Sequence, residues 1–228
     1  MIELAVPEAY RLWSASYDDG MNPVLALEMR VLHQWLNPLA ARRVLDVATG
    51  TGRWAAYLKS RGAQVIALDL SPAMLGVAAR KPELRGRLLA ADMRALPISD
   101  GAADLALCSL ALGYVESPEE VLRELARVAR TVVVSDLHPE AVAAGWERTF
   151  RSGGTTYRIR AFAHSVEAIE RAAKAVGLVE RWELDARFGP PEARFFQDAG
   201  RDAGKEDLFT QAQQFPAIFA RCWENARL

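Results

Sequence analysis

Short apolar runs alternate along the first two thirds of the chain with segments whose apolar residues recur at helical spacing. Continuously apolar runs are typical of strands that a parallel sheet buries on both faces. The alternation of such runs with helical segments predicts βαβ units and a parallel sheet. The predicted strands are 42–48, 63–70, 86–92, 102–110 and 130–137, and the predicted helices are 23–36, 52–62, 71–80 and 118–129.

The pattern changes after residue 138. Residues 147–162 predict a hairpin that turns at Gly153 and Gly154, which is an antiparallel addition rather than another βα unit. A helix capped by Ser165 follows. Two last strands are expected at 178–187 and 215–223, joined by a polar stretch at 187–206 that contains Gly and Pro.

Length and composition are those of a globular protein that buries a sizeable core. The chain has 228 residues, of which 51% are hydrophobic and 25% charged, so we expect one domain spanning 1–228. Within it, 1–36 is expected to form a helical lid and 139–165 a hairpin insertion. Cys108 and Cys222 lie in apolar runs without metal-ligand spacing, which favours buried reduced thiols and no metal site.

Charge and hydropathy narrow the range of partners. The 28 basic and 29 acidic residues nearly cancel, so no strong positive field is expected to attract nucleic acid or anionic lipid. A small-molecule substrate fits this balance better. The N-terminus lacks the basic and apolar regions of a secretory signal, and no run approaches the roughly 18 apolar residues of a membrane span. We therefore expect a cytoplasmic protein, and its oligomeric state stays open.

The stretch VLDVATGTGRWA, residues 44–55, carries the first chemical indication. It covers the end of a strand, a glycine loop and a helix start, where backbone N–H groups can approach a ligand. A simple tight turn is the alternative. Gly50, Gly52 and Ala55 also satisfy the dinucleotide form G-x-G-x-x-A. Asp46, however, would repel a pyrophosphate and would attract a cationic ligand such as S-adenosylmethionine.

Two more carboxylates follow at strand ends. Asp69 lies 17 residues after Gly52, at the end of the second strand, and is placed to bind a ribose diol. Asp92 ends the third strand and could accept a hydrogen bond from an adenine amino group. Ligands of open α/β sheets bind at the carboxyl ends of the strands, so these acids predict a nucleoside site.

Four segments of the chain carry recognisable motifs, and they are LDVATGTG, ALDLSPAML, AADMRALPI and DLALCSLALGYV. Together they resemble the motifs of class I S-adenosylmethionine-dependent methyltransferases, of the type-11 group that includes ubiquinone- and menaquinone-biosynthesis methyltransferases. Ala48 stands where the family usually has its first glycine. The resemblance implies a Rossmann-like three-layer α/β sandwich with a seven-stranded, mostly parallel sheet of order 3-2-1-4-5-7-6 and an antiparallel last strand.

The same resemblance implies roles for individual residues. S-adenosylmethionine would be the cofactor and S-adenosylhomocysteine its product. For Leu70 and Met74, which the resemblance places around adenine, packing in the hydrophobic core is an equal alternative. The implied cofactor contacts are Gly50 and Gly52 under the methionine part, Arg53 at its carboxylate, Asp69 at the ribose, Leu70, Met74, Asp92 and Met93 around adenine, and Ser109 and Leu110 beside the sulfonium. Asp46 and Ala48, in the first motif, are also expected to belong to the cofactor site.

A catalytic base is needed only for a nucleophile that is protonated at neutral pH. His138 follows the fifth predicted strand, near the expected reactive end of the site, and is the candidate base or substrate ligand. A loop histidine without a chemical role is the alternative. His164 could also reach the pocket, whereas His33 lies in a helical pattern and is expected to be structural or exposed.

Two further groups of side chains have both a structural and a functional interpretation. Tyr10, Trp13 and Tyr17 could form one packed side of a helix, or a lid in which Tyr17 borders the cofactor. Alternating arginines in the predicted hairpin could recognise an anion, or could simply be solvated. They are Arg148, Arg151, Arg158 and Arg160.

Three functions remain open from the sequence. The first is methyl transfer from S-adenosylmethionine to a small molecule by in-line displacement. The second is a nicotinamide-dependent oxidoreductase, which the G-x-G-x-x-A match favours and which Asp46 and Asp92 oppose. The third is a protein that binds S-adenosylmethionine without catalysis. The fold does not determine the methyl acceptor or its attacking atom.

Overall fold

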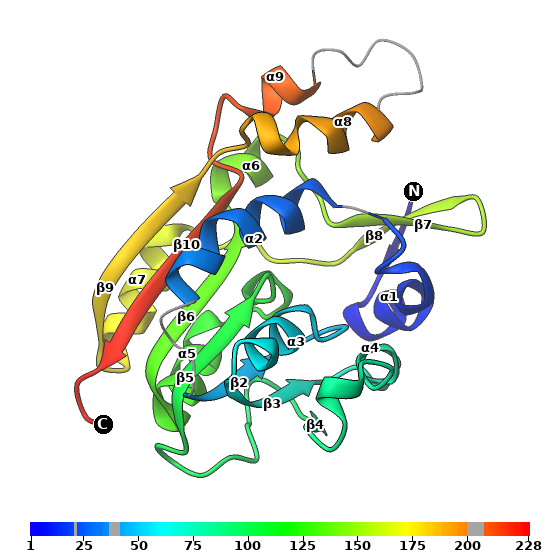
Figure 1. The fold of residues 1–228 in the computed structure, drawn as a ribbon. Coiled ribbons are helices and arrows are strands. Elements are labelled where there is room, and N and C mark those ends of the chain that lie inside the picture. Colours follow the sequence, from blue (N-terminus) through cyan, green and yellow to red (C-terminus); the bar gives the residue numbers. More distant parts are fainter. Residues whose placement is uncertain (21, 37–41, 200–207) are drawn as a thin grey trace.

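The computed structural model describes residues 1–20, 22–36, 42–199 and 208–228. Its main sheet has the order β4-β3-β2-β5-β6-β10-β9, in which β10 runs antiparallel to both of its neighbours and the remaining pairs are parallel (Figure 1). The predicted sheet order and its antiparallel last strand are confirmed. The strands are β2 (Arg43–Val47), β3 (Gln64–Asp69), β4 (Leu88–Ala90), β5 (Ala103–Ser109), β6 (Ala129–Leu137), β9 (Leu178–Ala186) and β10 (Ile218–Asn225).

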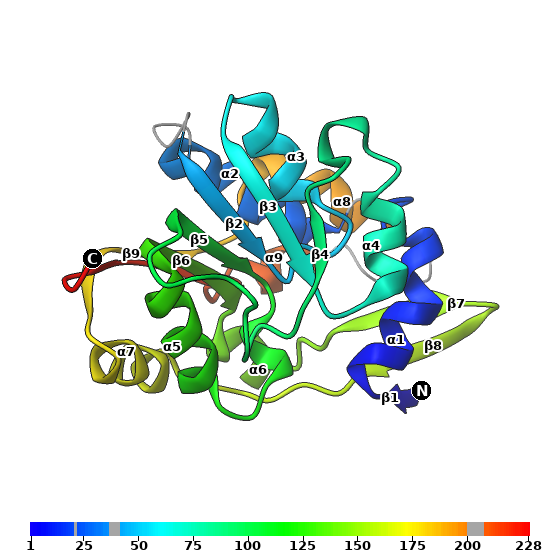
Figure 2. The same ribbon diagram turned by 90° about the horizontal axis from the view of Figure 1, so that it is seen from below.

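Helices cover both faces of this sheet and complete the three-layer sandwich (Figure 2). On one face α5 (Pro118–Val128) and α7 (Val166–Ala175) share a hydrophobic core with the sheet. On the other face α2 (Pro23–Leu36) and α3 (Arg53–Ser60) share a second core with it. The strands between the two cores are apolar on both faces because each face is packed against helices. Helix α4 (Pro72–Ala78) follows β3 and lies near the β4 edge.

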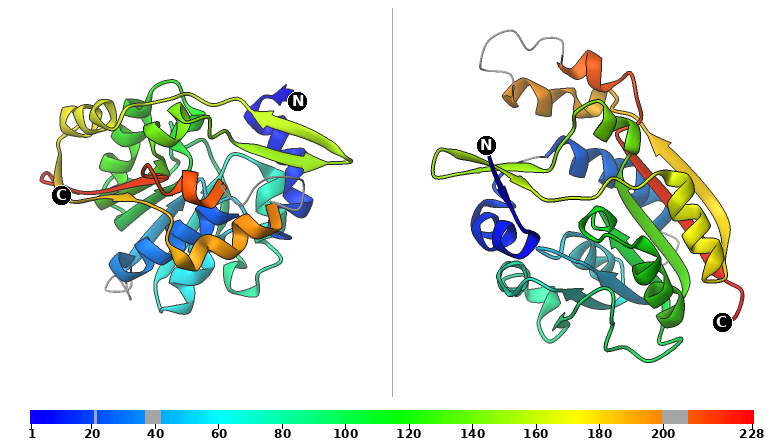
Figure 3. Two further views of the ribbon diagram at one scale, coloured as in Figure 1. Left: turned by 90° about the horizontal axis from the view of Figure 1, so that it is seen from above. Right: turned by 180° about the vertical axis from the view of Figure 1, so that it is seen from behind.

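A second, smaller sheet lies beside the carboxyl ends of β2, β3 and β4 (Figures 1 and 3). It has the order β1-β8-β7, from β1 (Ile2–Leu4), β8 (Thr155–Ile159) and β7 (Thr149–Ser152). Helix α1 (Val6–Trp13) packs on it around a small apolar cluster. We call β1, α1, β7 and β8 the cap. The predicted hairpin is confirmed, and the N-terminal strand that completes its sheet is an addition.

The remaining elements are short connections. The predicted irregular stretch at 187–206 contains η5 (Pro190–Glu192) and α8 (Ala193–Ala199), and its last residues, 200–206, lie outside the described residues. Neither Cys108 nor Cys222 forms a disulfide, and both are buried, as predicted. The other elements are α6 (Pro139–Ala143), α9 (Leu208–Ala212) and the 3-10 turns η1 (Ser14–Ser16), η3 (Pro82–Leu84) and η4 (Leu112–Tyr114).

Candidate active site

A cavity of about 770 Å³ opens between the carboxyl ends of the central strands and the cap. This is within the range of small-molecule and cofactor sites, roughly 300–1,000 Å³. Strand ends contribute Asp46, Asp69 and Ser109, and α1 contributes Val6 and Tyr10. All of the predicted cofactor residues except Gly52 line this cavity. The structure therefore brings together residues that the sequence spreads from 17 to 110.

Asp46 holds the glycine loop in place through hydrogen bonds. Its carboxylate is 1% exposed and accepts hydrogen bonds from Thr49 Oγ1 at 2.5 Å and from Ala55 N at 2.9 Å. Burial raises the pKa of Asp46 to about 6, although the bonds from Thr49 and Ala55 oppose that shift. The prediction from charge gave Asp46 a direct attraction for a cationic ligand. Its bonds show that it also fixes the loop and the start of α3.

The loop backbone adopts the left-handed conformation at several positions. Ala48 has φ +58° and so occupies a conformation that favours glycine, the residue expected there from the resemblance. Leu110, at the end of β5, has φ +54°. Such strained residues concentrate at ligand sites. Gly52 has φ +81°, and a Cβ there would lie 2.5 Å from Leu84 Cδ1, so Gly52 permits close packing instead of lining the cavity.

Asp69 ends β3 with its carboxylate turned to the loop. It accepts hydrogen bonds from Gly50 N at 2.7 Å and Ser71 N at 2.8 Å, and burial raises its pKa. Leu70 beside it is 57% exposed, whereas Met74 is 2% exposed. Leu70 thus presents an apolar surface to the cavity without belonging to the core, and Met74 serves both the core and the cavity wall.

Asp92 is placed at the cavity but is already paired. Its two carboxylate oxygens accept hydrogen bonds from the Arg94 guanidinium at 2.6–3.2 Å, and these bonds lower its pKa. Met93 and Arg94 line the cavity with it. The predicted bond from Asp92 to an adenine amino group would therefore share the carboxylate with Arg94.

A buried carboxylate that the sequence analysis missed lies next to the loop. Glu28 of α2 is 0% exposed and accepts hydrogen bonds from Arg53, from Trp54 Nε1 at 3.1 Å, from Ser109 Oγ at 2.7 Å and from Ser135 Oγ. The available signal was its place on the apolar side of a helix, since α2 buries Leu27, Glu28, Val31 and Leu32 together.

Arg53 retains an unused donor. Its Nη2 bonds Glu28, but its buried Nη1 has no hydrogen-bond partner, alone among the buried side-chain N and O atoms of the described residues. Buried donors are nearly always satisfied, so this atom indicates a missing acceptor. A carboxylate of a bound ligand would fit it. Arg53 and Ser109 both line the cavity.

The segment after α1 ties the cap to the glycine loop. Asp18 accepts a hydrogen bond from Thr51 Oγ1 at 2.8 Å and pairs with Lys81 Nζ at 3.1 Å, and Lys81 also donates to Thr51 O. Tyr17 lines the cavity and packs edge-on against Trp13, with ring centroids 4.7 Å apart. Tyr17 is thus placed where the lid interpretation requires it.

The structure does not bring His138 to the cavity. It is the N-cap of α6, its Nδ1 accepts from Glu140 N at 3.2 Å, and its Nε2 lies 3.8 Å from Asp185 Oδ1. His164 Nε2 lies 2.8 Å from Val115 O, and His33 is exposed on α2. No histidine is among the residues that line the cavity. The predicted position of His138, directly after β6, is correct. Helix α6 begins there, however, and the imidazole ring of His138 does not reach the cavity.

Comparison with known proteins points to the methyltransferases. Residues 45–134 match the family model described as a methyltransferase domain. The predicted resemblance is thereby confirmed, and S-adenosylmethionine is the cofactor of the class. Demethylmenaquinone methyltransferase of Thermus thermophilus is 46% identical over 94 residues, which are 39% of this chain and 43% of that protein.

Two further proteins extend the comparison. Malonyl-[acyl-carrier protein] O-methyltransferase of Halorhodospira halophila is 36% identical over 144 residues, 59% of this chain and 48% of that protein. The chain thus spans about half the length, or less, of these curated relatives. The S-adenosylmethionine-dependent methyltransferase of Mesorhizobium loti superposes with a TM-score of 0.68 at 20% identity, covering 89% of this chain and all of that one, which shows a shared fold.

Proposed function

We propose that this protein transfers a methyl group from S-adenosylmethionine to a small-molecule acceptor in the cavity beneath the cap. The observation that carries this proposal is that one cavity holds two matching features. Asp69 and the exposed Leu70 form a pair of neighbours on one side, and Arg53 offers its unpartnered Nη1. The first pair suits a ribose and an adenine ring. The second supplies a cation for the amino-acid carboxylate.

The remaining predicted residues complete the proposed cofactor site. Bound there, S-adenosylmethionine supplies an electrophilic methyl group on a sulfonium. Gly50 leaves room for close approach, and Asp46 holds the loop in register. Tyr17, in the segment that joins α1 to α2, limits access of water. The proposed contacts are Tyr17, Asp46, Ala48, Gly50, Arg53, Asp69, Leu70, Met74, Asp92, Met93, Ser109 and Leu110.

A small acceptor agrees with the space and charge of the molecule. The cavity can hold a cofactor together with a small molecule, and the chain has a formal net charge of −1. The relatives' names refer to a menaquinone precursor and to a malonyl group on a carrier protein. In the described residues, no helix is long and apolar enough to cross a bilayer. We propose no nucleic-acid partner.

Differential ligand binding tests the proposal. S-adenosylmethionine or S-adenosylhomocysteine at ~100 times its dissociation constant should stabilise the native state by about 2.7 kcal/mol, or roughly 5–11 °C in Tm. NAD(H) should give no comparable shift. A larger shift with NAD(H) would favour the oxidoreductase instead. Formation of S-adenosylhomocysteine in the presence of an acceptor separates catalysis from silent binding.

A further inference from the structure

Two tyrosines from distant parts of the chain meet in the cavity. Tyr10 lies on α1 of the cap, and Tyr114 ends η4 just after β5. Their hydroxyl oxygens are 2.6 Å apart, and both residues line the cavity. The two hydroxyl groups lie on the side of the cavity next to the cap, whereas Asp69 ends β3 and Asp92 follows β4.

The hydroxyl pair offers one hydrogen-bond donor to a ligand. Each phenol has one proton, and one of the two is used in the bond between them, whichever residue donates it. The other proton is left for a third group. Burial raises the pKa of both Tyr10 and Tyr114, so both stay neutral near pH 7 and act as donors instead of as phenolate bases.

A buried ion pair holds Tyr114 in place. The Arg148 guanidinium lies 4.9 Å from the Tyr114 ring centroid and pairs with Asp136. Asp136 also accepts from Gly113 N at 2.7 Å, which fixes the turn that carries Tyr114. A Cβ on Gly113 would lie 2.9 Å from Arg148 Nη2, so glycine is needed there for the guanidinium to reach Asp136. This network fixes the Tyr114 hydroxyl beside Tyr10, and the remaining phenolic proton favours an electron-rich ligand atom there.

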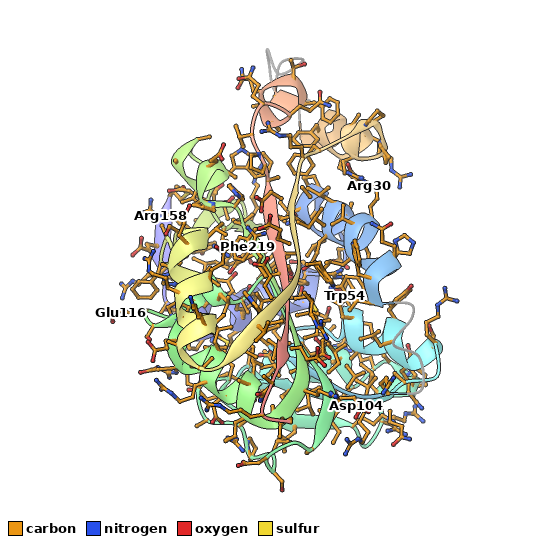
Figure 4. All side chains as sticks on the ribbon, turned by 90° about the vertical axis from the view of Figure 1, so that its left-hand side faces the viewer. Arg30, Trp54, Asp104, Glu116, Arg158 and Phe219 are labelled. Atoms are coloured by element: carbon orange, nitrogen blue, oxygen red, sulfur yellow. The ribbon has the colours of Figure 1, made fainter. Side chains whose placement is uncertain are left out.

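The residues that line the cavity provide no free base beside this pair. No histidine is among them, and their carboxylates Asp46, Asp69 and Asp92 already accept hydrogen bonds. Glu116, which also lines the cavity, is exposed at the periphery (Figure 4). An acceptor that must lose a proton, such as a phenol or an ammonium, would find no buried, unengaged group to take it.

We propose that Tyr10 and Tyr114 bind the carboxylate of an apolar carboxylic acid, and that this carboxylate is the methyl acceptor. The inference rests on the proposed function. A carboxylic acid is ionised at neutral pH because its pKa lies near 4, so it needs no base. Around the tyrosines the cavity wall is apolar, which suits a hydrocarbon body. That wall includes Val6, Pro7, Ala111, Val115 and Phe162.

Atoms and charges balance without a proton transfer. A carboxylate oxygen forms a bond to the methyl carbon with its own electron pair, the carbon–sulfur bond breaks, and that bond's electrons stay on sulfur. The negative carboxylate and the positive sulfonium become a neutral ester and a neutral thioether. Arg11 lines the cavity, is exposed and belongs to no ion pair within the described part of the chain, so it adds positive charge that attracts an incoming anion.

Ligand binding to protein saturated with S-adenosylhomocysteine tests the proposal. The probes are straight-chain carboxylates from butanoate to dodecanoate and 3-phenylpropanoate, each compared by calorimetry with its primary amide. We expect at least one acid to bind about tenfold more tightly than its amide, a difference of about 1.4 kcal/mol. Addition of S-adenosylmethionine should convert that acid to its methyl ester, detected by mass spectrometry.

Matched variants locate the effect. The double variant Tyr10→Phe/Tyr114→Phe removes both phenolic protons and should reduce acid affinity about tenfold or more, with a smaller loss of amide affinity and with S-adenosylhomocysteine affinity unchanged. Tyr157→Phe is the control, since Tyr157 packs on Phe150 within the cap and does not line the cavity. Melting curves of each variant identify any loss of folding, and the single variants Tyr10→Phe and Tyr114→Phe can be tested if the double variant fails to fold.

The outcomes separate this inference from the function on which it rests. If S-adenosylhomocysteine fails to bind, the proposed function fails. If it binds but no acid in the series exceeds its amide, or the Tyr10→Phe/Tyr114→Phe variant binds acid as the wild type does, only the carboxylate proposal is overturned. Methylation of a phenol or amine by a protein that ignores every acid would overturn it as well.

Discussion

Glu28 and Arg53 form an ion pair in which the carboxylate is fully buried and the guanidinium is partly exposed toward the cavity. They come from different helices, α2 and α3, and Trp54 next to Arg53 also donates to Glu28. Figure 4 shows Trp54 in the interior beside α2. The pair aims the cation at the cavity, and Nη1 remains for a ligand.

Arg53→Met should therefore damage both binding and folding. Loss of the charged donor should weaken S-adenosylmethionine binding by about 1.5–3 kcal/mol. Removal of the partner of a buried carboxylate should lower the free energy of unfolding by about 3–5 kcal/mol. Adding Glu28→Gln to Arg53→Met should restore part of the stability and none of the affinity. Denaturant unfolding and calorimetry measure the two effects, and wild-type affinity in Arg53→Met would contradict the assigned role.

Asp69→Ala should weaken cofactor binding by about 1.5–3 kcal/mol, the scale of a hydrogen bond to a charged group. Asp104→Ala is the matched control. Asp104 begins β5, pairs with Arg43 on the surface, and lies far from the cap residue Arg158 (Figure 4). Its replacement should leave affinity unchanged. Equal affinity of the Asp69 variant and the wild type for S-adenosylhomocysteine would show that the ribose is held elsewhere.

The main sheet could be predicted because its information is local. The apolar runs of β2, β3, β5 and β6 are each bounded by turn or capping residues, and the resemblance supplied their order. Strand β1 could not be found in the same way. It has three residues, of which only Leu4 is buried, and it pairs with β8, more than 150 residues away in sequence.

In the candidate site too, the residues that could be predicted are those whose role depends on local sequence. Asp46 and Asp69 follow from their positions at strand ends next to glycines. Tyr114 and Arg148 do not, because their environment comes from packing of the cap against the turn after β5. The Tyr10–Tyr114 contact joins residues 104 positions apart. Glu28 was missed because a single carboxylate in a helix is usually a surface residue.

Stability should respond to the titration of Asp46. The folded state holds the Asp46 proton up to about pH 6, whereas the unfolded chain loses it near pH 4. Native protein thus binds more protons between these values, so this contribution to stability is present below about pH 4 and is lost as pH rises through 6. The loss is about 3 kcal/mol for the wild type. The Asp46→Asn variant should lack it.

Unfolding free energies of both proteins from pH 4 to 7 provide the measurement. The difference between wild type and Asp46→Asn should fall steadily across this range. Parallel curves would mean that Asp46 has the same pKa in the folded and unfolded states, and that its burial is offset by the bonds from Thr49 and Ala55.

His138 provides the sharpest contrast between the sequence interpretation and the structure. As a base, it would contribute about 10² or more to the turnover rate. As the N-cap of α6, it contributes stability instead, typically about 1 kcal/mol. We therefore expect His138→Ala to lower the unfolding free energy by about 1 kcal/mol and to leave turnover and cofactor affinity within about twofold of wild type. His138→Asn should retain the cap.

The pH dependence of stability gives an independent measure of the same residue. Burial lowers the pKa of His138, so the unfolded chain takes up a proton before the folded protein does as pH falls. Its contribution is therefore present above about pH 6.5 and is lost as pH falls through the lower, folded pKa. His138→Asn removes this titration and should lose less stability than the wild type between pH 7 and 5. If turnover instead fell about a hundredfold in both variants at unchanged stability, the ring must reach the acceptor in a conformation other than this one, and base catalysis would return to His138.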